Sequence, residues 1–280
     1  MAIPGWATMD QAARDAAYNN NLAVKNSAEL IERRNTASAA FRKAHPAGLD
    51  VPYGSAPRQR FDLFAARDAA APCLVFIHGG YWQRNTREDF AAFAEGIMSH
   101  GWSVAMVGYT LAPDATLAAI VGEMGQALDW LGRNGPQHGL AAGPVVVSGW
   151  SAGGHLTAMA LSHPRVAAGL AISGVYELAP IRETYLNEKL GLTDEEVATL
   201  SPLRLPVVPK PLAIAYGDKE LPALVADSRD LHARRSAADA PGPLLPIAGA
   251  DHFTILEELR RPDGALVAAA RALLAWDSAV

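Results

Sequence analysis

The chain has 280 residues, 50% of them hydrophobic and 19% charged, as in a soluble globular protein with a sizeable core. Its formal net charge is −5 and it has no dense run of Lys and Arg, which argues against nucleic acid or an anionic membrane as partner. The single cysteine, Cys73, excludes an internal disulfide, and its apolar neighbours predict a buried, unreactive thiol. Without a secretory leader or a run of about 18 apolar residues, we expect a cytoplasmic protein with no membrane span.

The first predicted element precedes any strand. Residues 8–42 have a helix-like amphipathic pattern, and its apolar members include Leu30, Ile31 and Phe41. Residues 46–57 are rich in turn formers and end the segment. We therefore predict a helical N-terminal extension over residues 1–45, which either packs on the body of the protein or covers a site.

Strands and helices alternate after this extension. Predicted strands cover residues 60–65, 73–77, 102–107, 145–147, 166–172 and 212–216. Predicted helices cover residues 87–99, 115–131, 152–162, 222–236 and 253–276, the last broken near Pro262. The alternation predicts an α/β fold with a mostly parallel central sheet and helices on both faces. Residues 176–211 interrupt it and predict a small insertion, and we expect residues 1–280 to form a single domain.

A G-x-S-x-G sequence, Gly149-Trp150-Ser151-Ala152-Gly153, lies between a predicted strand and a predicted helix. A serine hydroxyl is a poor nucleophile unless a tight turn exposes it beside a base, and the flanking glycines permit such a turn. The bare motif is weak, because chance can produce it, and the strand-turn-helix context strengthens it. We predict that Ser151 is a nucleophile, against the alternative of an exposed serine in a structural turn.

A second glycine motif, His78-Gly79-Gly80-Tyr81-Trp82, directly follows the predicted strand over residues 73–77. In acyl transfer, negative charge develops on a carbonyl oxygen, and preorganised backbone N–H groups can stabilise it. We assign these donors to Gly80, Tyr81 and Ala152, the last being the residue after the predicted nucleophile. His78 is interpreted as a structural residue of the loop.

Eight histidines compete for the role of general base. His252 lies in a loop before the last predicted helix and completes the chain order serine, acid, histidine, so we predict it as the base. His155, one helical turn beyond Ser151, is interpreted as packed or capping, and Asp251 as a helix N-cap. Five others are interpreted as surface residues: His45, His100, His138, His163 and His232.

The carboxylate that orients the base is expected just after the predicted strand over residues 212–216. Asp218 is our prediction, because a carboxylate there can fix the tautomer of the base and stabilise its imidazolium. Glu220, two residues further on, is the main competitor. Asp227 and Asp230 lie on the next predicted helix and are expected to be solvated.

Aromatic side chains lie beside these motifs in the sequence. Tyr81 is joined by four that we predict to bind substrate: Trp82, Trp150, Tyr176 and Phe253. Packing explains any single one as well, but together they favour a flat aromatic substrate. The sequence has no H-x-x-E-H metal cluster, no phosphate-binding loop and no dinucleotide fingerprint, so we predict neither a metal nor a cofactor.

The segments that carry these motifs resemble a known family. Phe76-Ile77-His78-Gly79-Gly80-Tyr81-Trp82-Gln83 resembles the oxyanion segment of kynurenine formamidases (arylformamidases), a branch of the α/β hydrolases. Further similarity lies in residues 109–113, 149–156, 173–178 and 250–253, within a match that runs from about Tyr53 to the carboxyl end. The resemblance implies the α/β-hydrolase fold and a triad of Ser151, Asp218 and His252. It also implies hydrolysis of an N-formyl aryl amide, such as N-formylkynurenine, through a formyl-enzyme.

Three functions stay open at this point. The first is a cofactor-free serine hydrolase that cleaves a small acyl group from an aryl amide through an acyl-enzyme on Ser151. The second is a carboxylesterase for small aromatic esters or carbamates. The third is a non-catalytic binding protein on the same fold, which would normally have lost a member of the triad. We expect a small-molecule partner in each case, and a homodimer is left open.

Overall fold

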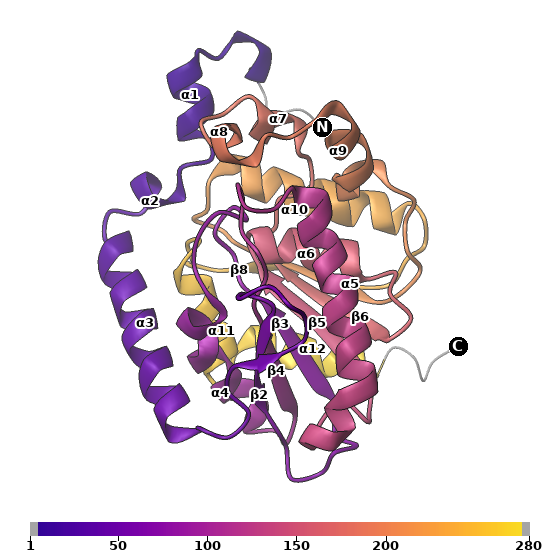
Figure 1. The fold of residues 1–280 in the computed structure, drawn as a ribbon. Helices are drawn as coiled ribbons and strands as arrows, with labels where there is room; N and C mark the ends of the chain where they lie inside the picture. The colour runs from indigo at the N-terminus through magenta and orange to yellow at the C-terminus, as the bar shows by residue number, and fades with distance from the viewer. Residues whose placement is uncertain (1–4, 276–280) are drawn as a thin grey trace.

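An eight-stranded sheet runs through the computed structural model, which describes residues 5–275 (Figure 1). The strands are β1 (Val51–Pro52), β2 (Arg60–Phe64), β3 (Cys73–Ile77), β4 (Ser103–Val107), β5 (Val145–Trp150), β6 (Val166–Ile172), β7 (Leu212–Gly217) and β8 (Leu244–Ile247). Their spatial order is β1-β2-β4-β3-β5-β6-β7-β8. From β4 to β8 every neighbouring pair is parallel, whereas β1 pairs with β2, and β2 with β4, in antiparallel fashion. The predicted mostly parallel sheet is confirmed.

Helices cover both faces of this sheet. Successive residues of β3 point to opposite faces, so Cys73 and Val75 belong to one buried cluster and Leu74 and Phe76 to the other. The first face is covered by α5 (Leu117–Asn134), α6 (Ala152–Ala160) and α10 (Pro222–Ser236). The second is covered by α4 (Glu95–Met98), α11 (Glu257–Arg260) and α12 (Ala265–Leu273). Figure 1 shows α5 and α12 on opposite sides of the strands.

Some element boundaries differ from the prediction. The segment predicted as one helix over residues 8–42 forms α1 (Gln11–Ala16), α2 (Asn20–Ala23) and α3 (Ser27–Ala44). The break has a local cause, because the Asn19 side chain accepts a hydrogen bond from the N–H of Leu22 and caps a new helix. Residues 87–99 begin with a 3-10 helix, η2 (Arg87–Ala94), before α4. Strand β8 was not predicted, since it is short and contains Pro246, which weakens a strand pattern.

The C-terminal helical segment is divided as its Pro and Gly residues predict. Residues 253–276 contain the 3-10 helix η5 (Thr254–Leu256), then α11 and α12, with Pro262 and Gly264 between the two α-helices. The predicted end at Trp276 lies outside the described residues. The longest described helices, α3 and α5, contain 18 residues each. Within residues 5–275 no helix combines the length and the apolar character needed to cross a membrane.

Cys73 lies at the start of β3, in the middle of the sheet. Its side chain is fully buried, as predicted, and it pairs in register with Ser103 on one side and Val145 on the other. Burial raises the pKa of the Cys73 thiol to about 12. The thiol is therefore un-ionised near neutral pH, which makes it a weak nucleophile.

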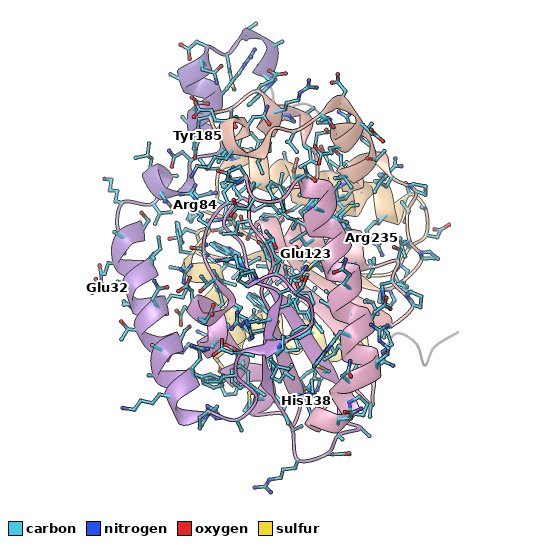
Figure 2. The ribbon with its side chains drawn as sticks, in the orientation of Figure 1. Glu32, Arg84, Glu123, His138, Tyr185 and Arg235 are labelled. Carbon is cyan, nitrogen blue, oxygen red and sulfur yellow. The ribbon has the colours of Figure 1, made fainter. Side chains whose placement is uncertain are left out.

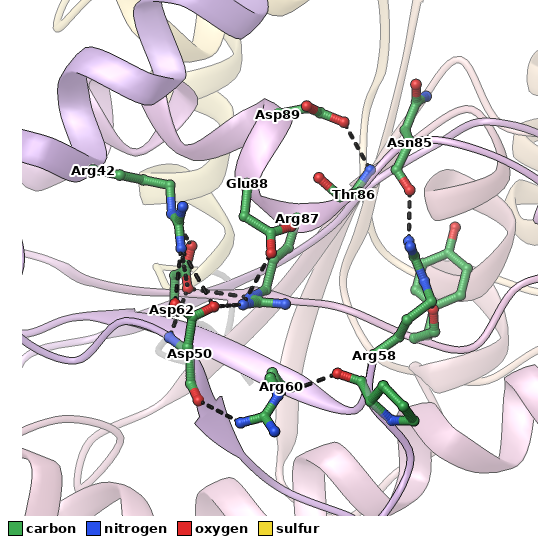
Figure 3. Close-up of polar contacts among 12 residues, drawn as sticks. Arg42, Asp50, Arg58, Arg60, Asp62, Asn85, Thr86, Arg87, Glu88 and Asp89 are labelled. Carbon is green, nitrogen blue, oxygen red and sulfur yellow. Dashed lines mark hydrogen bonds and ion pairs between the residues drawn. The ribbon is translucent and has the colours of Figure 1, made fainter.

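A buried carboxylate anchors α3 to the sheet. Asp62 on β2 has no exposed side-chain surface, and its oxygens accept hydrogen bonds from Nε of Arg42 (2.8 Å) and Nε of Arg87 (3.1 Å) (Figure 3). It also accepts the backbone N–H of Asp50 at 3.0 Å. Arg42 belongs to α3 and Arg87 to η2, so one carboxylate joins three segments. Two guanidinium groups compensate its burial, which is the condition under which a buried charge is tolerated.

The remainder of the N-terminal extension lies against the predicted insertion. Residues 176–211 contain α7 (Ala179–Arg182), α8 (Asn187–Leu190), α9 (Asp194–Leu200) and the 3-10 helix η4 (Pro202–Arg204). The indole N–H of Trp6 donates to the Glu183 carboxylate at 3.0 Å, and the Asp15 carboxylate accepts the N–H of Tyr185 at 2.8 Å. These contacts hold α1 beside α7 and α8 (Figure 1).

Candidate active site

The turn between β5 and α6 presents Ser151. This residue has φ 58° and ψ −119°, angles that cost energy for a residue with a side chain and that occur at strained functional turns. Glycines make the turn fit: a Cβ on Gly149 would lie 2.3 Å from the carbonyl oxygen of Gly153. A Cβ on Gly153 would lie 2.0 Å from the carbonyl oxygen of Ile77. The expected strand-turn-helix is present, and Ser151 lines a cavity.

His252 lines the same cavity from the loop that follows β8. Its Nδ1 lies 2.8 Å from Oε2 of Glu220, and both side chains are almost inaccessible to solvent. Trp150 packs against the imidazole, with ring centroids 4.6 Å apart, and its indole N–H donates to the His252 carbonyl at 2.7 Å. A carboxylate on Nδ1 fixes the tautomer that leaves Nε2 as the proton acceptor.

Three donors hold the Glu220 carboxylate in place. Its Oε2 faces His252, while Oε1 accepts the N–H of Gly217 at 2.8 Å and the hydroxyl of Ser173. Ser173 comes from the end of β6 and Gly217 from the end of β7. The carboxylate is therefore positioned by two strands of the sheet as well as by its contact with the imidazole.

The structure corrects the predicted acid. Asp218 is exposed, and its carboxylate accepts the N–H of Gly249 at 2.8 Å instead of facing His252. The reason is a tight turn after β7, in which the N–H of Glu220 donates to the carbonyl of Gly217 at 3.2 Å. The turn directs residue 218 outward and returns residue 220 to the base. Glu220, the competitor in the sequence, occupies the predicted place of Asp218.

Asp227 also differs from its prediction as a solvated residue. It lies on the inner face of α10, is 7% exposed, and accepts the backbone N–H groups of Tyr176 and Glu177. Burial raises the pKa of the Asp227 carboxyl to about 7, despite the two N–H donors that favour its ionised form. This residue lies apart from the cavity lining and fastens the start of the insertion to the core.

The predicted oxyanion loop presses against the nucleophile turn. Gly80, Tyr81 and Trp82 have φ values of 119°, 49° and 57°, so three successive residues adopt left-handed conformations. A Cβ on Gly79 would lie 2.9 Å from Cβ of Ser151, which shows how closely the two turns approach. Within residues 5–275 the N–H groups of Gly80, Tyr81 and Ala152 donate no hydrogen bond. All three donors assigned from the sequence are thus free to act.

The other histidines near the site are neutral packing residues. Burial lowers the pKa of His78 to about 3 and that of His155 to about 4. His78 stacks on Tyr109 with ring centroids 4.3 Å apart, and Nε2 of His155 lies 2.7 Å from the carbonyl of Leu200. Asp251 caps the next turn by accepting the N–H groups of residues 253 and 254. Of the five histidines predicted at the surface, three are exposed, namely His45, His100 and His138. The other two, His163 and His232, are half-buried.

The cavity has two kinds of wall. We call one wall the catalytic wall, because it contains the predicted nucleophile and base; it consists of Gly80, Tyr81, Trp150, Ser151, His252 and Phe253. The other, the extension wall, comes largely from the N-terminal extension, with Asn19, Asn20, Asn21, Ile31 and Arg34, and is completed by Arg84, Asn85 and Tyr185. The extension therefore contributes directly to the cavity.

Two of the four predicted substrate-binding aromatics reach this cavity. Trp150 and Phe253 line it, whereas Trp82 and Tyr176 are fully buried elsewhere in the core. The Trp82 ring packs edge-on against His155 at a centroid distance of 5.0 Å. The Tyr176 ring lies so close to Gly174 that a Cβ there would be 2.4 Å from it. Adjacency to a motif in the sequence did not predict adjacency in space for these two residues.

Several cavity residues were missed in the sequence. Arg34, Arg84 and Tyr185 are the clearest, because nothing in their local patterns separates them from residues on a solvated face. Ser173 was also missed as a partner of Glu220. Among residues 5–275 no group of three or more His, Cys, Asp or Glu side chains is arranged to hold a metal ion.

Comparison with known proteins finds similarity to hydrolases. The BD-FAE family matches residues 61–167. A kynurenine formamidase from Danio rerio is 27% identical over 75% of this chain and 76% of its own length. One from Salmo salar is 29% identical over the same shares. A crystal structure from Silicibacter sp. TM1040, of a candidate thioesterase, superposes with a TM-score of 0.81 at 28% identity and covers 92% of this chain and 98% of its own.

The chain is an arylformamidase-like α/β hydrolase. The predicted resemblance and enzyme class are both confirmed. Esterase LipC of Mycobacterium tuberculosis is 30% identical to this hydrolase over 39% of the chain and 28% of its own length. Esterase B from Lactobacillus rhamnosis shares the fold, with a TM-score of 0.69 at 19% identity over 95% of this chain and 98% of its own.

Proposed function

We propose that this hydrolase cleaves a small acyl group from an aryl amide through a covalent acyl-enzyme on Ser151. The observation that carries the proposal is the buried His252–Glu220 pair, which faces the same cavity as the strained Ser151 turn. His252 takes the proton of the Ser151 hydroxyl as its oxygen attacks the carbonyl carbon, and returns it to the leaving amine. Glu220 holds the imidazole in the required tautomer and stabilises its charged form.

The free N–H groups of Gly80, Tyr81 and Ala152 are the proposed oxyanion donors. They stabilise the negative charge on the carbonyl oxygen when the tetrahedral intermediate forms. Collapse of this intermediate breaks the bond between carbon and nitrogen and releases the aryl amine. Water, deprotonated by His252, then attacks the acyl-enzyme and regenerates the serine hydroxyl.

The small acyl group and the aromatic amine rest on the cavity walls and on the relatives. The kynurenine formamidases from fish are named for a formyl aryl amide, and Trp150, Phe253 and Tyr185 give this cavity aromatic surface. Tyr81 is fixed in the cavity wall by two hydrogen bonds: its hydroxyl donates to the carbonyl of Tyr18 (2.7 Å) and accepts from Nδ2 of Asn20 (3.2 Å). A rigid wall beside the oxyanion donors favours a formyl group over longer acyl chains.

A series of amides with one aryl amine and increasing acyl length tests this proposal. An excess methylene in a tight pocket costs about 10–200-fold in kcat/KM, so activity should fall steeply from formyl through acetyl to butyryl. Replacing the aryl amine by an alkyl amine should also lower kcat/KM. A flat profile with acyl length, or equal rates for aryl and alkyl amides, would reject the arylformamidase assignment.

A carboxylesterase acting on small aromatic esters or carbamates is the second candidate. It is supported by the esterase relatives, among them LipC. Because an ester is intrinsically easier to cleave, the two candidates are separated by the ratio of kcat/KM for a matched aryl amide and aryl ester. Amide turnover indistinguishable from background, with rapid ester turnover, would select the esterase. A protein that hydrolyses neither and resists a fluorophosphonate probe would be a binding protein.

A further inference from the structure

The cavity carries positive charge that no lining carboxylate neutralises. Arg34 from α3 and Arg84 from the loop after the oxyanion donors both line it, together with Ser151 and His252. No Asp or Glu side chain belongs to this lining among the described residues. The acid of the site, Glu220, lies behind the imidazole and outside the lining.

Arg34 is buried at the cavity, and among residues 5–275 no carboxylate lies within ion-pair distance of it. It is 9% exposed, its Nε and Nη2 donate to the side-chain oxygen of Asn35, and its guanidinium lies 4.2 Å from the ring centroid of Phe90. Burial lowers the pKa of Arg34 to about 10, so the guanidinium remains charged near neutral pH. Its hydrogen bonds go only to a neutral amide, and Asp89 acts on the charge from beyond ion-pair distance. Burial of a cation in this way is costly, and an anionic ligand would offset part of that cost.

Arg84 supplies a second, exposed cation at the same cavity. Among the described residues its side chain makes no hydrogen bond and no ion pair, so its guanidinium donors face solvent. Figure 2 shows Arg84 and Tyr185 on the side of the molecule next to α2. Asn19, Asn20 and Asn21, which are polar and uncharged, also line the cavity. Guanidinium groups bind carboxylates through charge-assisted hydrogen bonds, so two arginines in one cavity lining suit a carboxylate ligand.

We propose that this cavity selects substrates whose aryl part carries a carboxylate, bound by Arg34 and Arg84. This proposal rests on the proposed function in one respect: the carboxylate and the bond that is cleaved belong to the same molecule. Because the lining offers no carboxylate to a substrate ammonium group, an aryl carboxylate without an amino group is preferred over an amino acid. Arg34 and Arg84 are thus specificity residues and take no part in the chemical steps.

Three formamides of similar shape test the inference on the wild-type enzyme, with a ring carboxylate, a ring carboxamide or a ring aminomethyl group. Charge-assisted hydrogen bonds predict a kcat/KM about 10–100-fold higher for the carboxylate than for the carboxamide, mainly through KM. The aminomethyl compound should be the poorest. Equal or better use of the carboxamide or the aminomethyl compound would overturn the proposal.

The same comparison can be made by inhibition if none of the formamides is hydrolysed. With a model aryl ester as substrate, benzoate should compete at least ten times more strongly than benzamide. A failure to cleave formamides with preserved preference for benzoate would reject the amide reaction and keep the anion site. Cleavage of formamides with no preference among ring substituents, or equal inhibition by benzoate and benzamide, would reject the anion site.

Variants assign the preference to the two arginines. Arg34→Gln and Arg84→Gln should each reduce the ratio of kcat/KM for carboxylate over carboxamide by about tenfold. Arg33→Gln is the matched control, because Arg33 is exposed and does not line this cavity, and it should leave the ratio unchanged. The Arg84 contribution should shrink at high salt, whereas that of buried Arg34 should persist. If Arg34→Gln does not fold, the Arg84 variant decides; ratios equal to that of Arg33→Gln contradict the assignment.

Discussion

The catalytic wall and the extension wall of the cavity are held in different ways. The catalytic wall consists of turns at the ends of strands, where glycines and left-handed residues such as Gly80, Tyr81 and Ser151 fix the backbone. The extension wall is attached through side chains, by the Asp62 network at α3 and by hydrogen bonds at α1 and α2. The difference indicates that substitutions in the catalytic wall should change the chemical rate, and those in the extension should change stability and selectivity.

The largest effect is expected at the nucleophile. Ser151→Ala should lower kcat by about 10⁴-fold or more, because the attacking oxygen is removed while the turn keeps its glycines. The thermal midpoint should stay close to that of the wild type. A fluorophosphonate probe should label the wild-type protein and spare the variant. Near-normal turnover by the purified variant would disprove the role of Ser151.

Substitutions of the two carboxylates after β7 should differ sharply in their effect on kcat. Glu220→Gln should lower kcat by about 10³–10⁴-fold, because an amide at this place no longer enforces the tautomer of His252. Asp218→Asn is the matched control and should stay within about threefold of the wild type, since Asp218 is exposed and bonded to Gly249. This ranking reverses the one expected from the sequence. A larger loss in the Asp218 variant would restore the original assignment.

The attachment of α3 is tested at Asp62. Asp62→Ala should lower the free energy of unfolding by about 3–5 kcal/mol, because it removes the buried carboxylate that Arg42 and the buried Arg87 share and leaves them only the exposed Asp50 in common. Urea denaturation measures the change. Asp50→Ala is a useful comparison, since Asp50 is exposed and contacts the same two arginines. A similar small cost for both substitutions would show that the buried network does not anchor the extension.

The link between the two walls is tested at Tyr81. Tyr81→Phe removes the hydroxyl that joins the oxyanion loop to Tyr18 and Asn20, at an expected cost of about 1–3 kcal/mol in stability. Its backbone N–H is retained, so KM and acyl-length selectivity should change more than kcat. Steady-state kinetics on the acyl series, with denaturation of the same sample, separates the effects. If only kcat falls, this contact does not help the extension to shape the cavity.

The smallest effect is expected in the pH dependence of stability. The folded-state pKa of Asp227, about 7, lies above its ordinary value. The protonated carboxyl therefore contributes fully to the stability of the folded protein in acid, and this contribution is lost as pH rises from about 4 to 7. The thermal midpoint of the wild type relative to Asp227→Asn should therefore fall across this window. Both proteins share His78 and His155, whose lowered pKa values act in the opposite direction and cancel in the difference. A constant difference would show that Asp227 is ionised throughout.

The catalytic wall was largely predictable because its geometry is local. The Ser151 turn and the Gly80 loop each need glycines at fixed positions, so the sequence displays them directly. The choice between Asp218 and Glu220 was not predictable in this way. It depends on the direction of a turn after β7 and on the distant Gly249, neither of which leaves a pattern in the residues between them.

The extension wall was predicted only as a helical segment. Amphipathic spacing identifies an apolar face, but it cannot distinguish an arginine facing a cavity from one facing solvent. Arg33 and Arg34 are neighbours of the same type, yet one is exposed and the other lines the site. Trp82 shows the opposite error, because a residue next to a catalytic motif points into the core.

Because Cys73 is buried in the central sheet, its reaction with a thiol reagent can report how often the protein opens. A thiol reagent cannot reach the central strand β3 in the closed protein, so its reaction rate measures how often the sheet opens. A serine-directed probe measures the closed, active population in the same tube. Used together, the two reagents can distinguish an inhibitor that blocks the cavity from one that unfolds the chain.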